Sequence, residues 1–95
     1  MQTVTKTITK REAALLTAAA LGMAGSIPLE QGRDIVISAL KNYVRPMSSH
    51  VWGFLGVEVY LTDALSALAY GNNSEFWNNV DDAKDKCMSI LKATE

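Results

Sequence analysis

Two long segments of this chain carry almost no charge, and they constrain its fold more than any other feature. No charged side chain occurs from Ala13 to Leu29, and between Pro46 and Ser74 the only residues that can carry a charge near neutral pH are Glu58, Asp63 and His50. Of the 95 residues, 48% are apolar and 20% are charged. A domain this small cannot bury so much apolar surface by itself. We therefore expect a single domain over residues 1–95 that associates with another chain.

Apolar spacing predicts four short-to-medium helices and hence an all-α fold. The first helix, Lys10–Ala24, should begin with a capping box in which Thr9 and Glu12 each satisfy a backbone donor. Gly25 should end it in the left-handed conformation. Before it, threonines alternate with apolar and basic residues over residues 1–8, which predicts a flexible or extended arm.

Small residues and prolines add two expectations. Ala14, Ala18 and Gly22 recur at every fourth position of the first helix, and they predict a thin face along which another helix packs closely. The second helix is expected over Pro28–Val44. Pro46 should end it, because the residue before a proline avoids the helical region.

The third helix is expected over Ser49–Tyr70, although residues 50–61 are rich in β-branched and aromatic side chains and have a strand as the alternative. Residues 71–74, Gly-Asn-Asn-Ser, predict a turn. The last helix, Glu75–Lys92, is amphipathic. Packed together, the four helices form either an antiparallel bundle or an interlocked symmetric oligomer.

Charge and cysteine content exclude several classes of protein. The net charge of −1 argues against binding nucleic acid through phosphate neutralisation. The halves differ, since residues 1–50 carry +3 and residues 51–95 carry −4. A lone Cys87 excludes an internal disulfide and favours a reducing, cytoplasmic location. Residues 13–25 imitate a secretory signal, but Glu12 precedes them, and they are too short to span a membrane.

Two short motifs suggest metal or catalytic chemistry but favour a structural role. Residues 81–85, DDAKD, match the aspartate-rich pattern that holds magnesium in isoprenoid synthases. Those enzymes need a much longer chain, so we interpret the motif as a solvated helix face. His50 is the only histidine, so no histidine-based metal site can form in one chain. We expect no metal, no cofactor and no catalytic residue.

Glu58 lies alone between two valines in the most apolar part of the sequence. A buried carboxylate is costly unless it is paired. Glu58 therefore has three interpretations: an exposed rim residue, a partner of Arg33 or Arg45 in an intersubunit ion pair, or a ligand-binding or catalytic acid.

A basic cluster is the candidate site for a small ligand. Lys10 and Arg11 stand at the start of the first predicted helix, where backbone donors also favour anions. Together with Arg33 they could hold an anionic, nucleotide-like ligand between subunits. The alternative is that these charges are simply solvated.

Aromatic and aliphatic side chains of the third predicted helix are the candidate interface. The predicted interface residues are Trp52, Phe54, Leu55, Glu58, Val59, Tyr60 and Trp77. The leading hypothesis is a non-catalytic, homo-oligomeric binding protein that acts on another protein as an accessory or inhibitor. A sequestering oligomer for an anionic ligand is the alternative, and a small enzyme with a site between subunits is the third.

Overall fold

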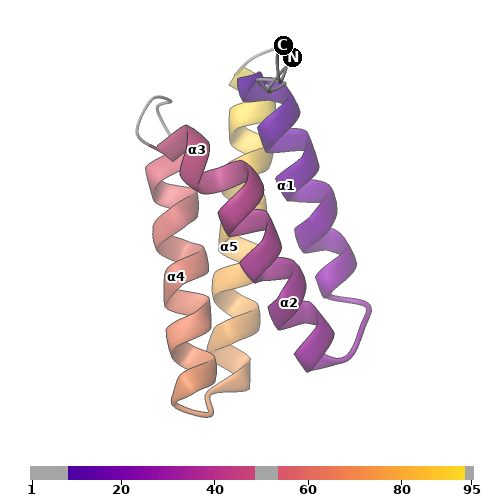
Figure 1. Cartoon of the computed structure of the whole chain (residues 1–95), viewed down its shortest axis with the longest axis vertical. Coiled ribbons are helices and arrows are strands. Elements are labelled where there is room, and N and C mark those ends of the chain that lie inside the picture. Colours follow the sequence, from indigo (N-terminus) through magenta and orange to yellow (C-terminus); the bar gives the residue numbers. More distant parts are fainter. Residues whose placement is uncertain (1–8, 49–53, 94–95) are drawn as a thin grey trace, which may run out of the picture.

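Every described element of the chain is helical. The computed structural model describes residues 9–48 and 54–93. Within these residues it contains no strand, and the helices are α1 (Lys10–Ala24), α2 (Leu29–Ala39), η1 (Leu40–Val44), α3 (Arg45–Ser48), α4 (Phe54–Ala69) and α5 (Asn73–Ala93). Because α2, η1 and α3 follow one another without a break, the described part of the chain forms four helical rods, which run alternately up and down (Figure 1). The predicted all-α fold is confirmed.

The start of α1 follows its sequence, but its end does not. The Glu12 backbone N–H donates to Thr9 Oγ1 at 3.1 Å, and the Thr9 N–H donates to Glu12 Oε1 at 3.2 Å, so the predicted capping box is present. Gly25 has φ −71°, in the right-handed region, so the prediction of a left-handed glycine was wrong. The helix instead ends in a tight turn, in which the Ser26 N–H donates to the Met23 carbonyl oxygen at 3.0 Å.

Pro46 does not end the second rod, contrary to the prediction. The rod continues through η1, a π-helical turn, into α3, and Arg45 keeps helical angles of φ −59° and ψ −42° although a proline follows it. In a π-turn each N–H bonds the carbonyl five residues back, as the Arg45 N–H does with Leu40. The wider spacing changes the backbone hydrogen-bond pattern of the helix at the position where the ring of Pro46 would otherwise clash with a backbone carbonyl.

The turn between α4 and α5 was predicted at the right place, although α5 begins at Asn73, two residues before the predicted Glu75. Gly71 has φ +76°, the left-handed conformation that only glycine adopts without strain. The Asn72 N–H donates to the Ala67 oxygen at 2.9 Å and the Gly71 N–H to the Leu68 oxygen at 3.0 Å, which is the Schellman pattern. Asn72 Oδ1 then accepts from the Glu75 N–H at 3.1 Å, so one residue closes α4 and caps α5. The end of α4 agrees with its predicted limit at Tyr70 to within one residue, and the strand alternative is wrong for residues 54–61.

The core lies between the four rods and combines large side chains from α4 and α5 with small ones from α1. Phe54, Leu61, Phe76 and Val80 are each at most 1% exposed. On the α1 side the buried residues are mainly alanines, which let α5 approach closely. The residues of the continuous core cluster are Ala13, Ala14, Ala18, Leu21, Val36, Leu40, Val44, Met47, Phe54, Val57, Leu61, Ala64, Ala67, Phe76, Val80, Ala83, Cys87 and Ile90.

At Gly32, α2 packs closely against both the end of α1 and α5. A methyl group on Gly32 would lie 3.0 Å from Trp77 Cη2 and 3.2 Å from the Ala24 carbonyl oxygen. We expect Gly32→Ala to lower the free energy of unfolding by about 1 kcal/mol, because overpacking of about 1–3 kcal/mol outweighs a helix-propensity gain of about 1 kcal/mol. Urea denaturation measures the change.

Gly56→Ala is the matched control. There the added methyl would meet only the Lys86 side chain, 2.9 Å from its Cε, which can swing aside. The propensity gain should then dominate, and stability should rise by up to about 1 kcal/mol. Equal stabilisation of both variants would show that the Gly32 contact is not tight.

Candidate binding surface

The predicted anion site is not assembled within one chain. Lys10 begins α1 at the end of the molecule where the helix starts beside the last turns of α5, whereas Arg33 lies near the start of α2 at the opposite end (Figure 1). Arg33 Nη2 lies 3.5 Å from Asp34 Oδ1, and both side chains are largely exposed. Within one chain, only Lys10 and Arg11 of the predicted site lie close to each other, and Arg33 could complete the site only from another subunit.

Glu58 forms an ion pair within its own chain. Its Oε1 lies 3.6 Å from Arg45 Nε, which links α4 to α3. The Glu58 side chain is 26% exposed and that of Arg45 is 58% exposed. A pair this accessible contributes about 0.2–1 kcal/mol. Among the interpretations of Glu58, the structure favours structural pairing with Arg45, but inside one subunit rather than between two.

The other predicted interface residues divide between core and surface. Phe54 is completely buried, because it shares a face of α4 with Val57 and Leu61, so its side chain is not available to a partner. Tyr60 and Trp77 are partly buried against the core. Only Leu55 and Val59 are exposed, at 61% and 51%; Trp52 and His50 lie outside the described residues.

A more continuous apolar surface lies on α1, the helix for which close packing along Ala14, Ala18 and Gly22 was predicted. Ala14 and Ala18 pack inward as predicted, but Gly22 is exposed and nothing lies within 4 Å of where its Cβ would be. The side of α1 turned away from the core carries Leu15 at 56% exposure, Leu16 at 40% and Met23 at 62%, with exposed Ala19 and Gly22 between them. We call these five residues the α1 outer face. The signal in the sequence was their spacing, 15, 16, 19, 22 and 23, which is one helical stripe.

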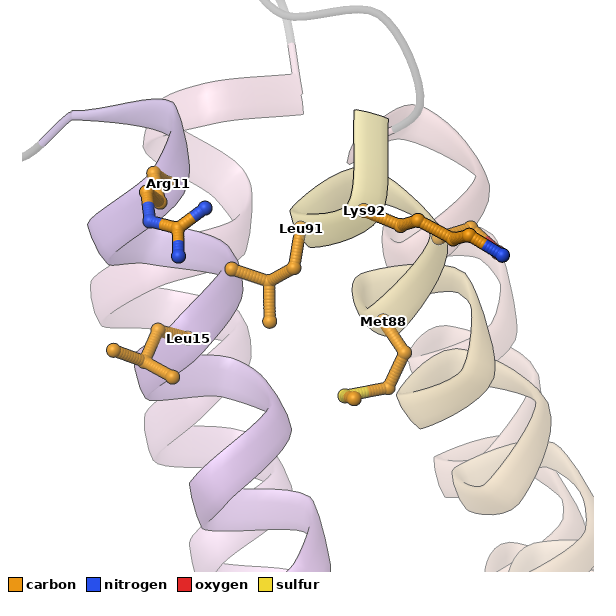
Figure 2. A pocket seen from close by; sticks show the side chains of 6 residues that line it. Arg11, Leu15, Met88, Leu91 and Lys92 are labelled. Carbon is orange, nitrogen blue, oxygen red and sulfur yellow. The ribbon is translucent and has the colours of Figure 1, made fainter. Parts of the chain in front are cut away.

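Two grooves flank this face. The α1–α5 groove is open, has a volume of about 490 Å³, and is lined by Arg11, Leu15, Met88, Ser89, Leu91 and Lys92. In Figure 2, Met88 and Leu91 project from α5 toward α1, and Arg11 lies above Leu15. The charged residues of its lining are both cationic. A smaller groove of about 170 Å³ between α1 and α2 has an uncharged lining: Ala20, Met23, Ile35, Ser38, Ala39 and Tyr43.

Few described side chains are arranged for chemistry. Cys87 is completely buried, and loss of solvation raises the pKa of its thiol from 9.0 to about 12. Such a thiol holds its proton and is a poor nucleophile. Within residues 9–48 and 54–93, no three His, Cys, Asp or Glu side chains converge as metal ligands. None of the described helices is both long and apolar enough to cross a membrane.

Comparison of the chain with protein-family models, curated proteins and solved structures gives no match. Any function must therefore be inferred from the surface itself. The feature to be explained is the α1 outer face, an exposed apolar ridge with a groove on each side and with Lys10 and Arg11 at the start of its helix.

Proposed function

We propose that this protein is a non-catalytic binding module, an accessory or inhibitory protein, and that the α1 outer face with its two grooves is the surface on which it binds another protein chain. The observation that carries the proposal is the exposure of Leu15, Leu16 and Met23 within a segment that has no charge from Ala13 to Leu29. Single exposed apolar residues are common, but a continuous apolar face of this kind marks an interaction site.

Shape and composition support a macromolecular partner. The α1 outer face is a ridge, and protein partners bury ridges by packing helices into the grooves beside them. Met88 and Met23 add flexible, polarizable side chains that adapt to an apolar partner. A lone thiol that is buried in the core also suits a reducing location such as the cytoplasm.

A small anionic ligand is the second candidate, and the α1–α5 groove supports it. Arg11 and Lys92 both line this groove, next to the apolar side chains of Leu15, Met88 and Leu91. That combination would suit an amphipathic anion, with a carboxylate or phosphate at the cationic end. Such a ligand should raise the melting temperature by an amount that grows with the logarithm of its concentration above the dissociation constant.

Site-specific photo-crosslinking tests the binding proposal. A photoreactive amino acid placed at Leu16 or Met23 should give discrete adducts to a protein chain in cells that express this protein. The same amino acid at Asp82, an exposed position of α5, is the matched control and should give none. Equal yields at all three positions, or adducts at none, would show that the α1 outer face does not bind protein.

A further inference from the structure

The α1 outer face is complementary in shape to the same face of a second α1 that runs antiparallel to it. Ala19 stands at its middle, with Leu15 four residues before it and Met23 four residues after it; Leu16 and Gly22 are each three residues away. If a second α1 packs antiparallel across Ala19, Leu15 of each copy faces Met23 of the other, and Leu16 faces Gly22. The space beside Gly22 is open, so it can receive a leucine side chain, and two alanines at the centre let the helix axes approach closely.

Charge decides the direction of this packing. Lys10 and Arg11 begin α1, and Lys92 lies in the neighbouring last turn of α5. A parallel pair would bring the three cations of each copy together at one end, which is unfavourable. An antiparallel pair places Lys10 and Arg11 near the turn that precedes α2 in the partner, where Glu30 is the first charged residue and the next cation, Arg33, is paired with Asp34. The dipoles of the two helices then also oppose each other.

We infer that the partner of the α1 outer face is a second copy of this chain, packed antiparallel about a twofold axis at Ala19. This inference rests on the proposed function, because it names the partner of the same surface. A stable interface covers about 800 Å² on each side, whereas α1, with 15 residues, is only about 22 Å long. The contact must therefore extend over the grooves on both sides, where it would cover the exposed Met88 on α5 and the half-buried Ile35 on α2.

The twofold axis gives a sharp test, because position 19 of one copy meets position 19 of the other. Sedimentation equilibrium of the purified chain at micromolar concentration should give twice the mass of the chain. Ala19→Glu and Ala19→Lys should each weaken self-association by about a hundredfold or more, since like charges meet at the axis. Ala19 is exposed on the isolated chain, so circular dichroism should show both variants folded.

Mixing the two variants provides the decisive measurement. Equimolar Ala19→Glu and Ala19→Lys should form a heterodimer at least tenfold tighter than either homodimer, because opposite charges then meet across the axis. Val59→Glu, at an exposed position of α4, is the control and should leave the dimer intact. No gain on mixing, an unchanged dimer in Ala19→Glu, or dissociation by Val59→Glu would overturn the inference.

The two proposals fail separately. A wild-type chain that is a monomer at 100 micromolar would overturn the dimer, while photo-crosslinks from Leu16 to a different protein would still support a protein-binding surface. Absence of crosslinks to any protein, the second copy included, would overturn both.

Discussion

Phe54→Ala is expected to remove about 3–5 kcal/mol from the free energy of unfolding, a large share of the stability of a domain this size. Phe54 is completely buried at the start of α4 and belongs to the core, although its sequence suggested an interface. Loss of its ring leaves a cavity that the neighbouring helices can only partly close. Urea denaturation, read by circular dichroism, measures the change.

Leu55→Ala is the matched control, one residue further along the same helix. Leu55 is 61% exposed, so its truncation should change stability by less than about 0.5 kcal/mol. Comparable losses for the two variants would mean that Phe54 does not lie in the core, and that the start of α4 is placed incorrectly.

Local features of the fold could be predicted from the sequence because a few neighbouring residues determine them. The capping box needs only Thr9 and Glu12. The turn after α4 needs only a glycine that tolerates positive φ and an asparagine that caps the next helix, which Gly71 and Asn72 supply. No distant contact has to be known for either.

Two other helix ends could not be predicted, because competing interactions decide them. Gly25 can adopt the left-handed conformation, but the Ser26 N–H closes the turn on Met23 without it. The rule that a helix ends before proline is a statistical preference of the backbone. At Pro46 a π-turn accommodates the ring, and burial of Val44 and Met47 on either side of it favours continuation of the rod.

The candidate surface was the least predictable feature, because α1 is apolar on both sides. Ala14 and Leu21 face inward while Leu15 and Met23 face outward, and no difference in hydropathy between the two faces indicates which is buried. Which face of α1 is buried depends on the helices beside it. The alanines allow α5 to pack closely against one face, and the leucines on the opposite face are therefore exposed. The converse applies to Phe54, whose size suggested a binding residue until its place beside Val57 and Leu61 was known.

Cys87 is expected to react with a thiol reagent at least about a thousandfold more slowly in the native protein than in the denatured chain. Its side chain is completely buried, so the reagent reaches it only when the structure opens, and opening costs most of the global stability. Alkylation with iodoacetamide at pH 8, followed by mass spectrometry with and without denaturant, measures the ratio. Rapid native alkylation would place Cys87 at the surface and contradict the packing of α5.

The pH dependence of this reaction gives a second, independent readout. Burial raises the pKa of the Cys87 thiol from 9.0 to about 12. The stability that comes from its neutral form is complete below pH 9. This stability is lost as the pH rises toward 12, by about 1.4 kcal/mol per unit, because only the unfolded chain has released the proton.

Alkylation of the denatured chain should level off above pH 9, because its thiol has then released the proton. Alkylation of the native protein should continue to rise, by up to about tenfold per unit, because the open state itself becomes more populated. A native rate that levels off at the same pH as the denatured rate would mean that the thiol titrates in contact with water.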